Sequence, residues 1–147
     1  MSVFPTKILL AIDGSESAKA AAKTATELAQ KTDSELHVMH VDTDIPNFMA
    51  EVEIDPDRIS QTARDLVQEQ VKKIEDTGGT VTETHLRVGN EAEEIVILSE
   101  SRNVGLVVIG SRGQSNWKRA VMGNVAEDVV RHAHCPVMVV REEEPRV

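Results

Sequence analysis

The sequence has very few aromatic residues and only one cysteine. It contains two phenylalanines, one tryptophan and no tyrosine, too few rings to form a platform on which the bases of a single-stranded nucleic acid could stack. Cys135 is the only cysteine. The chain therefore cannot form an internal disulfide, and we expect a reducing, cytoplasmic location.

Basic residues and long apolar runs are also scarce. The 16 Lys and Arg residues are outnumbered by 25 Asp and Glu residues, which gives a formal net charge of −9, and the phosphate backbone of a nucleic acid repels such a surface. No apolar run approaches the ~20 residues needed to cross a bilayer, and the first residues lack the pattern of a secretory signal. We expect neither a nucleic acid nor a membrane as partner.

Apolar runs alternate with helical patterns along the chain. The 147 residues fit one domain, 1–147, with loose termini at 1–5 and 142–147. Strands are predicted at 7–12, 35–41, 81–88, 106–109 and 136–141, and helices at 17–31, from Asp55-Pro56 to Gly78-Gly79, from Asn90, and from near Asn124. The run at 81–88 alternates polar and apolar residues, which indicates a strand near a sheet edge. Together the elements predict an α/β fold with parallel strands and helices on both faces.

Capping patterns mark the starts of three of these helices. Asp55 is followed by a proline, which suits the first helical position. Asn90 and Asn124 are each followed three residues later by a glutamate, the spacing of a capping box. We therefore expect both asparagines to cap their helices.

Glycines gather after the first and fourth predicted strands, where open parallel sheets bind their ligands. Gly110 and Gly113 would let the backbone turn and approach a phosphate closely. Gly123 precedes a helix N-terminus, whose free N–H groups favour an anion. Asn124 offers a cap or an amide donor, and Asp13, at the end of the first strand, offers an acceptor for ribose hydroxyls.

Charge supports a phosphate site in this region, although the glycines alone do not prove one. No acidic residue occurs from Ser101 to Ala126, where the average composition would place about four. Glycines before a helix also occur as simple turns. The loop is not a Walker A loop, because no Gly-Lys-Ser/Thr ends it, and it lacks the glycine spacing of dinucleotide-binding proteins.

Several segments resemble the universal stress protein family, and the resemblance spans nearly the whole chain. Segment 11–17 (AIDGSES) resembles the family's first strand and turn, and His40-Val41 the end of its second strand. Segments 106–113 (LVVIGSRG) and 135–141 (CPVMVVR) resemble its last two strands. The spacing of Gly110, Gly113 and Gly123, with two and nine residues between them, is the pattern of the family's ATP-binding branch.

This resemblance implies a three-layer, Rossmann-like sandwich of the adenine nucleotide alpha hydrolase-like type, with a five-stranded parallel sheet of order 3-2-1-4-5. Its pocket would lie between the first and fourth strands and bind ATP, with Mg²⁺ held by the phosphates and not by protein side chains. The residues expected around adenine and ribose are Ala11, Asp13 and Val41, and Ile12 and Ile109 are also expected to contact the nucleotide. Those expected at the phosphates are Gly110, Arg112, Gly113, Gly123, Asn124 and Val125. The family also implies a stress-response regulatory or interaction module that forms a homodimer through the last strand, 136–141.

One departure from the family pattern leaves a second hypothesis open. Asn124 stands where the ATP-binding branch has Ser or Thr, and its longer side chain would either donate an amide to a phosphate or crowd it. The alternative is a dimeric, stress-related interaction protein that does not bind ATP or binds another nucleotide such as cyclic AMP.

Catalysis is less well indicated than binding. No nucleophile with an adjacent base is evident, so we expect a non-enzymatic protein; slow ATP hydrolysis, or autophosphorylation on Ser111 or Ser115, stays open. Trp117 would either cover the pocket or anchor the glycine loop.

The histidines give little sign of a metal site. His132, His134 and Cys135 suggest zinc, but no second cluster supplies the missing ligands. The remaining three, His37, His40 and His85, lie on predicted strands, where we expect packed or surface residues without a partner.

Overall fold

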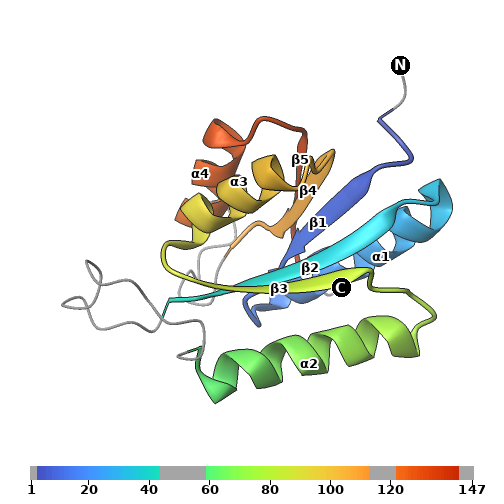
Figure 1. The fold of residues 1–147 in the computed structure, drawn as a ribbon, viewed down its shortest axis with the longest axis horizontal. Helices are drawn as coiled ribbons and strands as arrows, with labels where there is room; N and C mark the ends of the chain where they lie inside the picture. The colour runs from blue at the N-terminus through green and yellow to red at the C-terminus, as the bar shows by residue number, and fades with distance from the viewer. Residues whose placement is uncertain (1–2, 44–58, 113–121, 143–147) are drawn as a thin grey trace, which may run out of the picture.

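The computed structural model describes residues 3–43, 59–112 and 122–142. It confirms the five-stranded parallel sheet of order β3-β2-β1-β4-β5 (Figure 1). The strands are β1 (Lys7–Ala11), β2 (Glu35–Asp42), β3 (Glu83–Val88), β4 (Leu106–Gly110) and β5 (Val137–Val140), and the helices are α1 (Glu16–Thr32), α2 (Gln61–Asp76), α3 (Glu91–Ser101) and α4 (Asn124–His132). β3 lies at a sheet edge, as its alternating sequence predicts.

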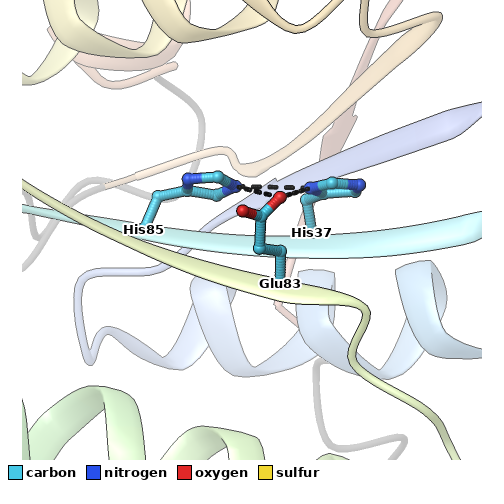
Figure 2. A group of neighbouring side chains, drawn as sticks. All are labelled: His37, Glu83 and His85. Carbon is cyan, nitrogen blue, oxygen red and sulfur yellow. Dashed lines mark hydrogen bonds and ion pairs between the residues drawn. The ribbon is translucent and has the colours of Figure 1, made fainter.

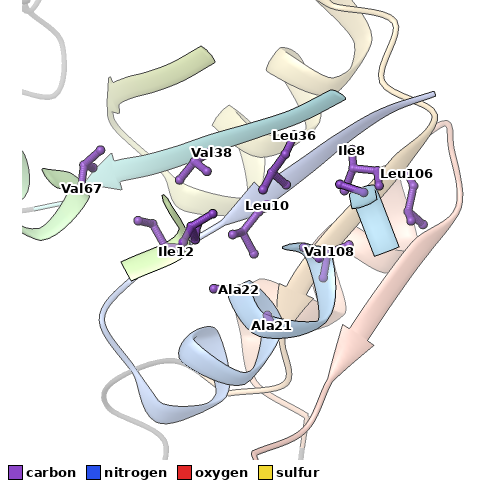
Figure 3. Close-up of a cluster of buried hydrophobic side chains, with 13 residues drawn as sticks. Ile8, Leu10, Ile12, Ala21, Ala22, Leu36, Val38, Val67, Leu106 and Val108 are labelled. Carbon is purple, nitrogen blue, oxygen red and sulfur yellow. The ribbon is translucent and has the colours of Figure 1, made fainter. Parts of the chain in front are cut away.

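Helices cover both faces of the sheet and create two cores. Ile8 and Leu10 of β1 point toward α1 and α2, while Leu9 and Ala11 point toward α3 and α4, because successive side chains of a strand face opposite sides. The core on the α1 side (Figure 3) is built from branched strand residues and from alanines of α1. Small side chains such as Ala21 and Ala25, both fully buried, allow α1 to lie close to the sheet.

Capping side chains determine where the helices begin. Ser15 caps α1 by accepting the N–H of Ala18, and Asn90 caps α3 by accepting the N–H of Glu93. The prediction for Asn90 is confirmed. The prediction for Asn124 is wrong: Gly123 takes the extended N-cap conformation, and Asn124 is already the first helical residue of α4, with an exposed side chain.

The predicted start of α2 is also wrong. Asp55 and Pro56 lie outside the described residues, but Ser60 has an extended conformation and is the N-cap of α2, so the helix begins at Gln61. Two hydrogen bonds explain this start. The hydroxyl of Ser60 accepts the N–H of Ala63, and the Ser60 N–H donates to the Asp42 carboxylate at 2.9 Å. Within the described residues, none of the helices is both long and apolar enough to span a bilayer.

Candidate functional site

A pocket opens where β1 and β4 end, with about 390 Å³ of space between atoms when the open solvent at its mouth is included. Chain connections leave this point in opposite directions, since β1 leads to β2 and β4 leads to β5, and such switch points are the usual ligand sites of open α/β sheets. The residues that line the pocket are Ala11, Ile12, Asp13, Ser15, Ala18, Met39, Val41, Glu91, Ile95, Ile109, Gly110, Arg112, Val125 and Ala126.

Of the expected residues that the structure describes, eight line this pocket and two do not. Those that line it are Ala11, Ile12, Asp13, Val41, Ile109, Gly110, Arg112 and Val125. Gly113 lies outside the described residues, as do Ser115 and Trp117. Gly123 and Asn124 are not among the lining residues: Gly123 is buried, and its N–H donates to the Ser111 carbonyl at 2.6 Å. Ser111 is itself only 7% exposed.

Gly110 is needed for packing against α1. A Cβ at this position would lie 2.6 Å from the Ser17 hydroxyl and 2.7 Å from the backbone nitrogen of Ala18, closer than real Cβ atoms approach other heavy atoms. The absent side chain therefore allows the end of β4 to meet the start of α1. This contact is a reason for a glycine here that does not depend on phosphate.

Hydrogen bonds join the two strand ends that form the pocket. The Asp13 carboxylate accepts the Ser15 N–H at 2.9 Å, which orients the turn between β1 and α1. The hydroxyls of Ser15 and Ser17 donate to the Arg112 carbonyl at 3.2 and 2.5 Å. The backbone after β4 is thereby fixed to the first turn of α1.

Among the described residues that line the pocket, Arg112 is the basic one, and it already has a partner. Its side chain is 9% exposed, and its guanidinium forms an ion pair with Glu142, just beyond β5. The sequence predicts that Arg112 lies at the phosphates. In the structure that role requires Arg112 to exchange the Glu142 carboxylate for a ligand or to bind both.

Glu91 lines the pocket but is not among the site residues predicted from the sequence. It begins α3 and lines the pocket with Asp13. Burial and then the nearby Asp13 carboxylate raise the pKa of Glu91. A signal for it is present in the sequence, because Glu91 follows the predicted strand 81–88, and all strands of a parallel sheet end at the same edge.

A second group of ionisable side chains lies away from the pocket. His37 and His85, expected to lack partners, face each other with 3.3 Å between Nδ1 and Nε2, so that expectation is wrong. His40 contacts the Ile12 carbonyl. Among the described residues, the groups with ligand atoms close enough for a metal include His37, Glu83 and His85, but not His132, His134 or Cys135. Burial raises the pKa of the Cys135 thiol.

The comparison with protein families agrees with the resemblance seen in the sequence. The model of the universal stress protein family matches residues 5–141. The chain belongs to the universal stress protein family. Universal stress protein MJ0531 of Methanocaldococcus jannaschii is 34% identical over 140 residues, which cover 92% of this chain and 82% of that protein.

Solved structures of the family share the fold. The structure of MJ0577, another universal stress protein of M. jannaschii, is 28% identical, superposes with a TM-score of 0.78 and matches 97% of this chain and 99% of that one. A universal stress protein in complex with cAMP is 20% identical, with a TM-score of 0.75 over 97% of this chain and 100% of the other. The latter similarity shows a common fold.

Proposed function

We propose that this universal stress protein binds ATP with Mg²⁺ in the pocket between β1 and β4 and acts in the cytoplasm as a nucleotide-dependent regulatory or interaction module. The observation that carries the proposal is the polarity of the pocket. Asp13 and Glu91 provide acceptors on one side, and Arg112 provides the positive charge. Acceptors suit ribose hydroxyls and an amino group of the base, whereas a cation suits phosphates.

The apolar lining supports a nucleoside rather than a free phosphate. Ala11, Val41 and Ile109 surround the same space as the carboxylates, and flat bases bind between apolar side chains with a few polar groups that fix their orientation. The chain's residues thus fit a nucleotide, and Mg²⁺, when bound, would neutralise phosphate charge.

Cyclic AMP is the second candidate, and the ion pair between Arg112 and Glu142 favours it. A triphosphate needs more positive charge than a cyclic monophosphate, and this ion pair already neutralises the arginine of the pocket. A protein of the same fold has been solved with cAMP. Calorimetric titration with MgATP and with cAMP separates the two candidates by affinity.

A substitution within α4 tests the location of the site. Val125 lines the pocket, whereas Val130 on the same helix is 45% exposed. Val125→Phe should fill the pocket and weaken MgATP binding at least tenfold, and Val130→Phe, the matched control, should leave it unchanged. Equal affinities in both variants would show that nucleotide does not bind in this pocket.

The same proposal includes a homodimer formed through β5. Val137, Met138, Val139 and Val140 are all partly exposed in the described chain, and β5 is the outer strand of the sheet. An apolar edge strand invites pairing with another chain, and a second copy offers the same edge. Sedimentation velocity should give twice the chain mass of 16.1 kDa; a monomer at micromolar concentration would contradict the dimer.

A further inference from the structure

Two histidines and a glutamate meet near the amino-terminal ends of β2 and β3, whereas the pocket lies at the opposite, carboxyl ends of the strands. His37 pairs in register with Glu83, and His85 pairs with Met39. All three side chains therefore project from the sheet face opposite α2 (Figure 2). His37 and His85 are each 4% exposed, while the side chain of Glu83 is 47% exposed. The two histidines of the cluster are therefore buried, and Glu83 is its solvent-exposed member.

The three candidate ligand atoms have the spacing of a metal site. His37 Nδ1 lies 3.3 Å from His85 Nε2, and Glu83 Oε2 lies 3.6 Å from the first nitrogen and 3.8 Å from the second. A tetrahedral zinc ion with bonds of about 2.0–2.2 Å separates its ligands by about 3.3–3.6 Å. Small side-chain rotations would therefore bring all three atoms within bonding distance of a single ion.

The other nitrogen of His37 points to the same interpretation. Among the described side chains, His37 Nε2 is buried without a hydrogen-bond partner, and the Glu35 carboxylate lies 3.7 Å away. In the tautomer that carries its proton on Nε2, this proton would face the Glu35 carboxylate and Nδ1 would be an acceptor toward the cluster. Histidines that bind metals commonly have a carboxylate on the opposite nitrogen.

We propose that His37, Glu83 and His85 bind a divalent transition-metal ion, with Zn²⁺ as the best match, and that water completes the coordination. Two imidazoles with one carboxylate form a ligand set that zinc accepts with an open fourth position. Glu35 acts as a positioning residue through His37. This site does not depend on nucleotide binding.

Substitution of Arg102 should change the metal affinity in the opposite direction, because it should strengthen binding. Its guanidinium Nη1 lies 3.8 Å from Glu83 Oε2, and its side chain is 45% exposed, so it competes with a metal for the carboxylate and can move into solvent. Removing it should strengthen metal binding, whereas a purely structural role for the cluster predicts no such gain. An exposed ion pair of this kind corresponds to about two- to fivefold in affinity.

The test is a titration of the chelator-treated protein with Co²⁺, followed by displacement with Zn²⁺. The visible absorption of Co²⁺ should show four-coordination and saturate at one ion per chain. Glu83→Gln should weaken binding by about 100-fold or more, and Glu35→Gln by about 10- to 100-fold. Arg102→Gln should tighten it by about two- to fivefold. His134→Gln, at an exposed histidine outside the cluster, is the matched control and should bind as the parent does.

Two results would overturn the proposal. One is the absence of saturable Co²⁺ or Zn²⁺ binding at concentrations up to 1 mM, which would leave the histidines as a hydrogen-bonded pair. The other is binding that Glu83→Gln and Arg102→Gln do not alter, which would place the ion elsewhere. Both substitutions are at partly exposed side chains, so far-ultraviolet circular dichroism should show the parent fold, and loss of folding does not account for a change in affinity.

Discussion

Replacing Gly110 by alanine should destabilise the protein, although alanine ordinarily stabilises a strand relative to glycine. The new Cβ would lie 2.6 Å from the Ser17 hydroxyl and 2.7 Å from both Ala18 N and the Ser17 carbonyl carbon. Overpacking of this kind costs about 1–3 kcal/mol. Alanine also restricts the conformations of the unfolded chain, which stabilises the folded state by about 0.4–1 kcal/mol. The steric cost is larger, and we expect a net loss of about 1–2 kcal/mol.

Thermal unfolding measures this loss, and a double substitution identifies its cause. For a domain of this size the loss corresponds to a decrease in Tm of roughly 2–8 °C. Ser17→Ala removes only the hydroxyl and leaves the backbone contacts of α1, so it should not rescue Gly110→Ala. An unchanged or increased Tm in Gly110→Ala would show that α1 moves aside without cost. Rescue by Ser17→Ala would show that the hydroxyl alone causes the clash.

Three further predictions follow from the pocket and the helix ends. Because burial and Asp13 raise the pKa of Glu91 above 4.5, the folded state binds that proton more tightly than the unfolded state, and stability falls as pH rises through the raised pKa. Glu91→Gln should therefore increase Tm at pH 7, with the gain disappearing below about pH 4; a gain that is constant with pH would refute this. Glu142→Gln should free Arg112 and lower the Kd for MgATP roughly tenfold, about 1.4 kcal/mol, in calorimetric titrations, and an unchanged Kd would contradict a phosphate role for Arg112. Asn90→Ala should remove a helix cap and lower the free energy of unfolding by about 1 kcal/mol, whereas Asn124→Ala should leave it almost unchanged. Equal losses in the two variants would contradict the finding that Asn90 caps its helix and Asn124 does not.

The sheet and most helix ends could be predicted because they depend on local patterns. Apolar runs such as Leu106–Ile109 predict buried strands, and Asn90 with Glu93 predicts the start of α3. The strand order came from the family resemblance. The same local patterns failed at Asn124, because a capping residue must lie one position before the helix, and Gly123 occupies that position.

Contacts between distant residues could not be predicted in this way. His37 and His85 meet because β2 and β3 pair in a register that places residues 48 positions apart on one face. Arg112 meets Glu142 because the chain beyond β5 passes the end of β4. In both cases the sequence shows the residue types but not which distant segments lie side by side, and that arrangement decides whether a polar side chain has a partner.

The most direct test of the proposed function is calorimetric titration of the nucleotide-free protein with MgATP. We expect one site per chain, with ATP bound more tightly than AMP or cyclic AMP. At 100 times its Kd, ATP should then add about 2.7 kcal/mol to the free energy of unfolding, which is roughly 5–11 °C in Tm. No heat of binding at millimolar MgATP, from protein shown by its ultraviolet spectrum to carry no nucleotide, would contradict the account. The glycines would then serve only the fold.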